Sequence, residues 1–572
     1  MADYCQPKAD KDNKPSFHPN SGITWEQIYG DNGWCNAQQS TIQCSCHQEI
    51  ATPCDGSVPM EQTCLNQCSG HGDCHMGYCR CLEGWYGSDC SRKKAGSPME
   101  PGVQATRPWI ERLVTIPPAA METPPKPTRP RPLIYVYDVP ADYTTRMLQY
   151  RLIGQACLYR RFHEGNHTSF TSWTYSIESY LHEALLTSEH RTFDPEEADF
   201  FYVPVYVTCY FWPIMGYADH PWYHSPYGFR VMHGANLVRE VHEWVKTALP
   251  YWKRRGGRDH IWLFAADEGA CWAPTEIFNT SIMLTHWGRM DLNHTSNTAY
   301  LADNYNGPLA PEFLPWKGLD FQEHIKGHPC YDPKKDLVIP AWKPPDHYKQ
   351  SPLMGAPPVE RDILLYFRGE VGSNRLEHYS RKIRQRMFKL AYENKWWDKH
   401  KILIGASGQV GGSYSEQLAR SKFCLVAPGD GWSTRAEDAI VHGCVPLIVM
   451  DEVHGVYESI LDYASFSIRI RESALEAVPD ILNAVTPAQL AKMQRHLAKV
   501  WHRFTYTTGR VMKEAVKRVM LDNLDAGHSP NAPRGQVRSD HPFQRHTSFP
   551  FEDDAFGTIM QWLYHRIPFT RG

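Results

Sequence analysis

The chain has 572 residues and a formal net charge of −3 at pH 7, from 60 basic and 63 acidic residues. This balance provides no polybasic surface, which argues against wholesale binding to nucleic acid or to an anionic membrane. Hydrophobic residues make up 42% of the chain, enough for several domains with ordinary cores.

Cysteines are concentrated near the start: eleven of the 17 fall within the first 90 residues. Such density indicates disulfides, zinc or thiol chemistry, and disulfides persist in oxidising compartments. Three sequons, at Asn166, Asn279 and Asn293, agree with glycosylation of a lumenal or extracellular protein. The first 30 residues contain no apolar signal region, and no stretch has 18 consecutive apolar residues. We therefore expect a signal or membrane anchor to be missing from this sequence.

Three segments precede the first regular strand pattern. Residues 1–60 are typical of an irregular cysteine-containing extension, residues 61–92 of a compact module, and residues 93–132, with ten prolines, of a semi-rigid linker. The cysteines of the module have the spacing Cys64-x3-Cys68-x5-Cys74-x4-Cys79-x-Cys81-x8-Cys90.

This spacing, with Gly84-Trp-Tyr-Gly87 between the last two cysteines, resembles an EGF-like module. The resemblance implies the disulfides Cys64–Cys74, Cys68–Cys79 and Cys81–Cys90, which would stabilise a unit too small for a large core. The alternative is a zinc site that uses His71, His75 and the thiols. An acidic calcium-binding segment does not precede Cys64. We expect the module to be a spacer or protein contact without chemistry of its own.

From residue 133 the pattern predicts an α/β domain that extends to residue 355. Apolar runs predict strands, and helical segments lie between them, which is typical of a parallel sheet. The predicted strands are 133–137, 200–207 and 260–264, and the predicted helical segments are 175–188, 194–198 and 238–249.

A second α/β unit is predicted over residues 356–522, followed by a polar segment and a terminal helix in residues 523–572. Its predicted strands are 363–367, 423–427 and 445–449, and its predicted helices are 381–392, 414–420 and 435–442. The loop Pro428-Gly-Asp-Gly-Trp432 lies between a strand and a helix. Free N–H groups at the start of that helix suit a pyrophosphate, and Arg435 can hold a phosphate bidentately. On spacing alone, a strand-turn-helix that binds no ligand is an equally good interpretation of this stretch.

Four ordered motifs resemble the exostosin family of glycosyltransferases over about residues 133–522. They are Asp194-Pro-Glu-Glu-Ala-Asp-Phe-Phe-Tyr-Val-Pro204, Gly257-Arg-Asp-His260, Tyr366-Phe-Arg-Gly369, and the stretch from Ser421-Lys-Phe-Cys-Leu425 to Gly443-Cys-Val-Pro446. An EGF-like module ahead of such a domain is similar to a plant and green-algal subgroup. The resemblance implies a GT-B fold, in which two Rossmann-like domains face a cleft, and inversion at the anomeric carbon. It also implies a type II membrane protein of the Golgi.

The resemblance places the nucleotide-sugar on the second domain. Counting back from Gly443 makes Asp438 the ribose-binding acid, with Glu437 as the fallback. The residues expected to contact the diphosphate or its loop are Arg368, Gly429, Gly431 and Arg435, with Lys422 as a weaker candidate.

An inverting transfer needs a general base on the acceptor side. Asp267 and then Glu268 are the candidates, because they follow a predicted strand at the end where open α/β sheets bind ligands. A solvated acidic turn is the alternative. His260 is expected to be structural. No Asp-x-Asp motif lies in the catalytic region, so no metal and no cofactor is expected.

The sequence therefore predicts transfer of a sugar from a UDP-sugar to a cell-wall polysaccharide or an extracellular glycoprotein. The first expectation is arabinosyl transfer to hydroxyproline-rich glycoproteins. The alternatives are a non-catalytic EGF-bearing scaffold and a partner subunit in a hetero-oligomer with another glycosyltransferase. Six cysteines of the catalytic region are available to pair, whereas the apolar strand contexts of Cys424 and Cys444 are typical of buried thiols.

Overall fold

A computed structural model describes most of the chain beyond residue 63. The described residues are 64–75, 77–94, 130–149, 157–163, 167–211, 230–299, 304–307, 320–373, 375–526 and 549–571. The predicted extension at 1–60, most of the linker at 93–132 and the sequon at Asn166 lie outside them.

The first α/β unit contains a six-stranded sheet in which every pair of neighbouring strands is parallel. The strands are buried and, apart from the edge strand β8, mainly apolar, as a parallel sheet covered by helices requires. In spatial order they are β13 (Leu337–Val338), β11 (Ile282–Thr285), β10 (His260–Phe264), β9 (Phe200–Tyr202), β5 (Ile134–Val136) and β8 (Arg191–Thr192). Its helices include α3 (Ile177–Thr187), α5 (Arg230–Ala248), α6 (Tyr251–Arg255), α7 (Thr275–Thr280) and α8 (Phe321–His324).

Two local predictions in this unit are wrong. The strand predicted to reach residue 207 ends at Tyr202, because Pro204 has no N–H for a ladder, and α4 (Val207–Cys209) follows. The helical segment predicted at 194–198 is a turn, in which the Asp194 carboxylate accepts a hydrogen bond from the Glu196 N–H. Such a side-chain bond offers the backbone an alternative to the helix.

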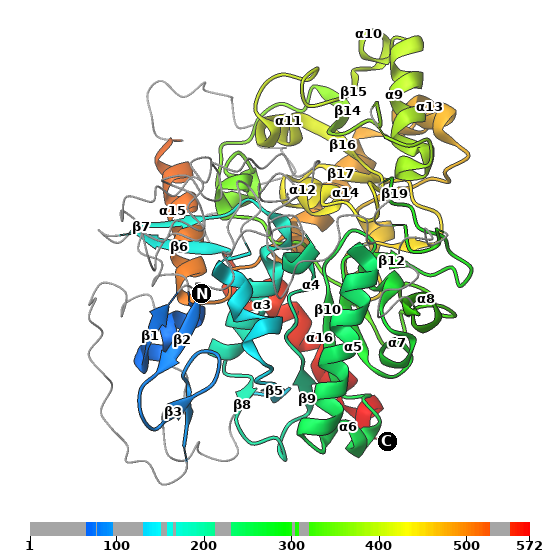
Figure 1. Ribbon diagram of the computed structural model, residues 1–572. Helices are drawn as coiled ribbons and strands as arrows, with labels where there is room; N and C mark the ends of the chain where they lie inside the picture. Colours follow the sequence, from blue (N-terminus) through cyan, green and yellow to red (C-terminus); the bar gives the residue numbers. More distant parts are fainter. Residues whose placement is uncertain are drawn as a thin grey trace, which may run out of the picture.

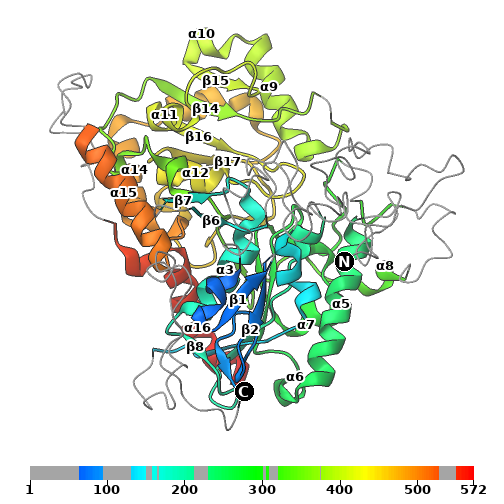
Figure 2. The same ribbon diagram turned by 60° about the vertical axis from the view of Figure 1, so that its left-hand side comes forward.

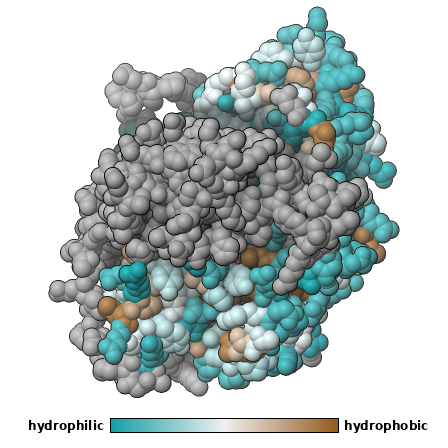
Figure 3. Space-filling view, viewed as in Figure 1, coloured by the Kyte–Doolittle hydropathy of each residue, from teal (hydrophilic) through white to brown (hydrophobic). Residues whose placement is uncertain are grey.

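The second α/β unit contains a five-stranded sheet, again with every neighbouring pair parallel. In spatial order the strands are β15 (Ile402–Gly405), β14 (Ile363–Arg368), β16 (Ser421–Val426), β17 (Val445–Ile448) and β19 (Ile468–Arg469). The helices are α9 (Ile383–Glu393), α10 (Trp396–His400), α11 (Tyr414–Arg420), α12 (Arg435–Val441), α13 (Val478–Asn483), α14 (Pro487–Val500) and α15 (Arg510–Ala526). Hydrophilic residues dominate the surface over α9 and α10 (Figure 3).

The two units are joined at several points, in the two-domain arrangement that the sequence predicts. The short strands β12 (Gly288–Arg289) and β18 (Val453–His454), one from each unit, pair antiparallel. The last helix, α16 (Ala555–Arg571), returns from the second unit to the first and lies beside its sheet (Figures 1 and 2). The fold is therefore the expected α/β fold of GT-B type, with two Rossmann-like units closed by a C-terminal crossover.

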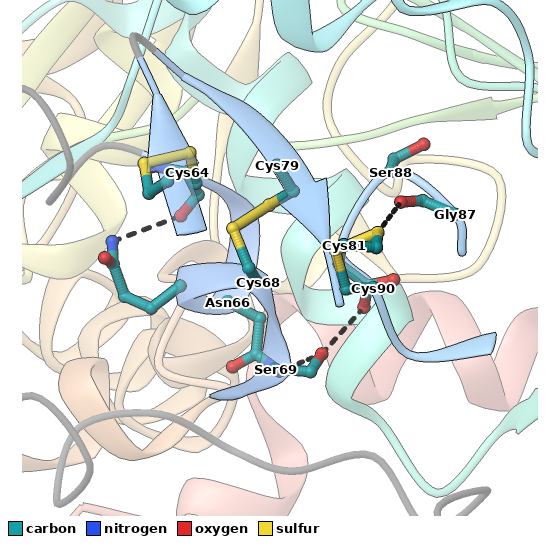
Figure 4. The surroundings of a disulfide bond; sticks show 12 residues. Cys64, Asn66, Cys68, Ser69, Cys79, Cys81, Gly87, Ser88 and Cys90 are labelled. Atoms are coloured by element: carbon teal, nitrogen blue, oxygen red, sulfur yellow. Dashed lines mark hydrogen bonds between the residues drawn. A yellow bond between two sulfur atoms is a disulfide. The ribbon is translucent and has the colours of Figure 1, made fainter. Parts of the chain in front are cut away.

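The small N-terminal module is built from disulfides and two short hairpins. The bridges Cys64–Cys74, Cys68–Cys79 and Cys81–Cys90 are those of the EGF resemblance (Figure 4). The zinc alternative is wrong, because these sulfurs are bonded in pairs. The His71 ring is stacked on the Trp85 ring, with 3.6 Å between the ring centres. The strands are β1 (Gly72–His75), β2 (Tyr78–Cys81), β3 (Trp85–Tyr86) and β4 (Arg92–Lys93).

The catalytic units also contain disulfides. Cys424 is bonded to Cys444, which corrects the expectation of two buried thiols: neighbouring strand β16 and the turn before β17 bring the sulfurs together. The other two bridges of these units are Cys157–Cys209 and Cys271–Cys330. The remaining five of the 17 cysteines lie outside the described residues. Among the helices that the structure describes, none combines the length and the apolar character needed to cross a membrane.

Candidate active site at the junction of the two units

Asp267 lies where the first unit meets the glycine loop of the second. It follows β10 at the carboxyl end of the sheet, and its backbone oxygen accepts a hydrogen bond from Trp432 N–H at 2.9 Å. A Cβ added at Gly431 would lie 1.8 Å from the same oxygen, so only glycine permits this contact. The structure therefore brings together a predicted base and the predicted donor loop, which are 164 positions apart.

The Asp267 carboxyl is half-buried and is held by one neighbour. Tyr175 donates its hydroxyl to Oδ1. Burial raises the pKa of Asp267 to about 6, with a further rise from Asp430, while the Tyr175 hydrogen bond opposes the increase. A carboxyl that titrates near 6 is largely ionised at neutral pH and retains more basicity than an exposed aspartate, as general-base catalysis requires.

The side chain of Glu268, the next residue, points away from the Asp267 carboxyl and toward residues 296–297. Its carboxyl accepts hydrogen bonds from Asn297 N–H at 2.6 Å and Ser296 Oγ at 2.7 Å, and only 3% of the residue is exposed. Burial raises the pKa of Glu268 to about 8. This geometry fixes the loop that contains Ser296, and it leaves Asp267 as the better placed of the two predicted bases.

Arg435 reaches the Tyr-Phe-Arg-Gly motif, where it contacts the backbone of Arg368. Arg435 Nη2 donates to the Arg368 carbonyl oxygen at 3.2 Å, and its guanidinium lies 5.3 Å from the centre of the Phe367 ring. A Cβ on Gly369 would lie 2.2 Å from Arg435 Nη2, so the Tyr-Phe-Arg-Gly motif needs its glycine to admit this side chain. Arg368 donates to the Gly412 carbonyl oxygen at 2.8 Å.

Arg384 is a third cation at this place, and the sequence did not reveal it. It projects from α9, is 5% exposed, and donates to the Ala427 carbonyl oxygen at 2.9 Å and to Tyr379 Oη at 2.8 Å. The position of a Cβ on Gly429 is 3.5 Å from its Nη2. Burial, and then the nearby Arg435, lower the pKa of Arg384 to about 10. Its helix carries several basic residues in sequence, and only packing shows which of them turns inward.

These three arginines have carbonyl, hydroxyl and ring partners, and none forms an ion pair with a carboxylate of the described residues. The acidic residue of the loop, Asp430, is instead paired with Arg375, and it accepts a hydrogen bond from Ala299 N–H at 2.8 Å. No direct ion pair with a described carboxylate therefore neutralises Arg384 or Arg435, although Asp430 and Asp438 interact with them electrostatically, and both guanidinium groups suit an anionic ligand.

The Asp438 carboxylate is contacted by several side chains of the same protein. It is 1% exposed and is contacted by His347 Nε2 at 2.9 Å, Lys343 Nζ at 3.6 Å and Tyr414 Oη at 3.0 Å. Burial alone would raise the pKa of Asp438, but Lys343, His347 and Arg435 together hold it well below the usual range. Sequence reasoning missed His347 and Lys343, because they lie 91 and 95 residues away from Asp438 and no local motif marks them.

Glu437 is also buried, and its two oxygens differ. Oε1 accepts the Ala341 N–H at 3.1 Å, while Oε2 has no hydrogen-bond partner among the described residues. Burial raises the pKa of Glu437 to about 7. The two carboxylates of α12 therefore both face the segment that joins the units, and Glu437 has the spare acceptor.

The remaining predicted residues take other places. His260 is fully buried between Asp259 and Tyr137, with contacts of 2.9 Å to each, which agrees with a structural role. Lys422 lies near the start of β16, at the end of the strand opposite the glycine loop. The sequons at Asn279 and Asn293 are on exposed residues.

Comparison with known proteins identifies the family of the chain. The model of the exostosin GT47 domain matches residues 128–485, which is more than half of the chain, and a teneurin-like EGF domain matches residues 64–93. Similarity to the solved structure of TarM is weak: the TM-score is 0.24 at 10% identity, over 48% of this chain and 57% of the other.

Three plant proteins illustrate the similarity. A probable glucuronosyltransferase of Oryza sativa subsp. japonica is 28% identical over 399 residues, which are 68% of this chain and 78% of that protein. A probable glucuronoxylan glucuronosyltransferase of Arabidopsis thaliana is 27% identical over 376 residues, 64% of this chain and 69% of the other. A probable beta-1,4-xylosyltransferase of Arabidopsis thaliana is 25% identical over 370 residues, 64% and 74%. With its matching domain and fold, the chain belongs to the exostosin GT47 family of glycosyltransferases.

Proposed function

We propose that this protein is an inverting glycosyltransferase that transfers a sugar from a UDP-sugar to a glycan acceptor. One observation carries the proposal: Asp267 and the glycine loop are in direct contact, and Arg384 lies beside the loop without an ion pair to any carboxylate of the described residues. The first feature supplies a base, and the second suits a departing diphosphate.

In the proposed reaction, Asp267 removes the proton from an acceptor hydroxyl as that oxygen attacks the anomeric carbon. The bond between this carbon and the diphosphate oxygen breaks, and UDP leaves with the bonding electron pair. Arg435, Arg368 and Arg384 offset the negative charge that develops on the diphosphate. Attack from the side opposite the leaving group inverts the configuration.

The names of the relatives favour a glucuronosyl or xylosyl donor. We therefore rank UDP-glucuronic acid and UDP-xylose ahead of UDP-arabinose, the first expectation from the sequence. A cell-wall polysaccharide is the proposed acceptor, and a glycoprotein glycan is the second choice.

The proposed location is the Golgi lumen, with a type II membrane topology, and hetero-oligomer formation with a second glycosyltransferase is part of the proposal. The disulfides and exposed sequons support an oxidising, glycosylating compartment. We propose that no cofactor or catalytic metal takes part, and that arginine side chains offset the charge of the diphosphate instead.

A two-step experiment tests the function. Titration calorimetry with UDP should show binding that Arg435→Ala weakens and that Arg386→Ala, an exposed change on α9, does not. UDP release is then measured with each donor and a panel of xylan and glycoprotein acceptors, with and without EDTA. We expect turnover that EDTA leaves unchanged. Complete loss in EDTA with recovery in manganese would contradict the metal-free mechanism.

A specific observation favours a second candidate, a non-catalytic partner subunit. Asp438, the acid expected to bind ribose, is already held by Lys343, His347 and Tyr414. Binding of UDP without turnover on any acceptor would support the subunit, and turnover by the purified chain would exclude it.

A further inference from the structure

The EGF-like module is packed into the first unit along a buried seam. Leu65 of the module is fully buried and belongs to the same apolar cluster as the core of that unit. Asp89 of the module pairs with Arg191 of β8 at 3.2 Å, and the two side chains are only 1% and 2% exposed. A tethered spacer would leave these charges in water, whereas here both are buried against the first unit.

Glu183 bonds to both sides of the seam, which is the buried contact between the module and the first unit. From α3 it accepts hydrogen bonds from Asn66 N–H of the module at 3.1 Å, from Tyr159 Oη at 2.7 Å and from Arg160 Nε at 3.0 Å. Arg160 also donates to the Cys64 carbonyl oxygen at 3.2 Å. Because a buried carboxylate is costly without such partners, the module and Arg160 depend on one another for their position.

The seam continues toward the crossing segment, residues 339–348, which runs from the first unit to the second. Arg160 begins β6 (Arg160–His163), which pairs with β7 (His167–Phe170). Thr171 follows β7, its N–H donates to the Tyr159 carbonyl oxygen at 3.0 Å, and its own carbonyl accepts the Trp342 indole N–H at 3.0 Å. The rings of Tyr159 and Trp342 are 5.1 Å apart.

The crossing segment in turn holds the carboxylates of α12. The N–H of Ala341, next to Trp342, donates to Glu437, and Lys343 and His347 contact Asp438. A continuous set of buried contacts thus joins the module to the helix that begins with Arg435.

We propose that the EGF-like module is a brace that positions the crossing segment, and through it the two carboxylates of α12. The module then contributes to the geometry of the transferase domain. Glu183 and Trp342 are positioning residues, because they act through the crossing segment and not on a ligand. Only the expected effect on UDP rests on the proposed function.

The experiment separates the module from the rest of the protein after folding. A protease site is inserted into the full chain between residues 105 and 120 and cleaved, and the product is examined by gel filtration. Hydrogen exchange of the peptide 337–348 and the affinity for UDP are measured on the same sample. We expect the module to stay bound after cleavage, with slow exchange at Ala341 and unchanged UDP affinity.

Glu183→Gln should release the module from the cleaved protein, accelerate exchange at Ala341 at least tenfold and weaken UDP binding at least fivefold. Arg191→Met is the second variant if Glu183→Gln does not fold, and Arg80→Met, an exposed change on the module, is the control that should behave as the wild type. Separation of the module from the cleaved wild type would overturn the proposal, as would its release without faster exchange. If no form binds UDP, the proposed function fails, while the exchange result still decides whether the module is a brace.

Discussion

At the scale of the residue, neighbouring acids with similar sequence contexts have different surroundings. Asp267 is half-buried at the unit junction, whereas Glu268 is enclosed by Ser296 and Asn297. One Glu437 oxygen has no hydrogen-bond partner in the part of the chain that the structure describes, and the Asp438 carboxylate is surrounded by donors. The direction of each side chain, and not its chemical type, separates a reactive carboxylate from a structural one.

Arg435→Ala should weaken UDP binding. It removes a charge-assisted contact to an anion, which is typically about 2–3 kcal/mol, so the Kd should rise by about 30- to 150-fold. Calorimetry on the folded variant checks this. A change of less than about twofold would remove Arg435 from the donor site.

The pH dependence of kcat/KM should follow Asp267. Because burial raises its pKa to about 6 and the base must be ionised, activity should rise as the pH increases through about 6. Tyr175 donates a hydrogen bond that lowers this pKa, so Tyr175→Phe should move the acid limb to higher pH. An identical limb in both proteins would show that another group is the base.

Asp438→Asn and Glu437→Gln should have opposite effects on stability. Asp438 has a lowered pKa, so its charge stabilises the fold above about pH 4, and this contribution is lost as the pH falls. Removing one partner from a buried ionic cluster costs about 3–5 kcal/mol, so Asp438→Asn should be destabilising at pH 7.

Glu437 has a pKa raised to about 7, so its ionisation destabilises the fold progressively as the pH rises from about 4 to 7. Glu437→Gln should therefore be at least as stable as the wild type at pH 8 and should lose that advantage near pH 4. Urea unfolding across this pH range measures both variants. A stable Asp438→Asn at pH 7 would mean that the carboxylate is not structural.

At the scale of the element, the glycine loop between β16 and α12 has to lie against the first unit. Gly431 contacts the Asp267 backbone so closely that a side chain has no room, and Trp432 N–H completes the contact. The loop is therefore shaped by its partner across the junction as much as by its own sequence.

Gly431→Ala should separate the loop from Asp267, since the added Cβ would lie 1.8 Å from a backbone oxygen that cannot move aside cheaply. We expect kcat to fall much more than stability, because the clash is confined to the junction. Gly408→Ala, in an exposed loop of the same unit, is the matched control: a Cβ there would meet no neighbour within 4 Å. Equal kcat values for the two variants would contradict the proposed role of the loop.

At the scale of the whole molecule, α16 connects the two units. Tyr457 Oη of the second unit donates to the Ala555 carbonyl oxygen at 2.9 Å, and Arg571 pairs with Asp199 of the first. The last helix therefore contacts both units and links them.

Leu563→Ala should destabilise the protein by about 2–5 kcal/mol, because Leu563 is 1% exposed in the common core. Tyr564→Ala, on the same helix but at a position that is 53% exposed, should change stability by less than about 0.5 kcal/mol. Thermal unfolding should show one transition for both proteins. A second transition in Leu563→Ala would show that the units unfold independently.

The sequence by itself determined the features whose signals are local. Buried apolar runs identified the strands at 260–264 and 363–367, cysteine spacing identified the module, and the turn after residue 427 identified the helix that begins at Arg435. It was less successful where a side-chain bond or a proline changed the backbone, as at Asp194 and Pro204. These signals act over a few residues, so reading them needs no knowledge of the fold.

Only the tertiary structure decided which groups meet. The contacts between Asp267 and Trp432, Asp438 and His347, and Asp89 and Arg191 join positions that are about 90 to 165 residues apart. The inward turn of Arg384 depends on the loop that packs over it. No periodicity or motif encodes such pairs, because their energy comes from burying both partners together, and burial is a property of the packed chain.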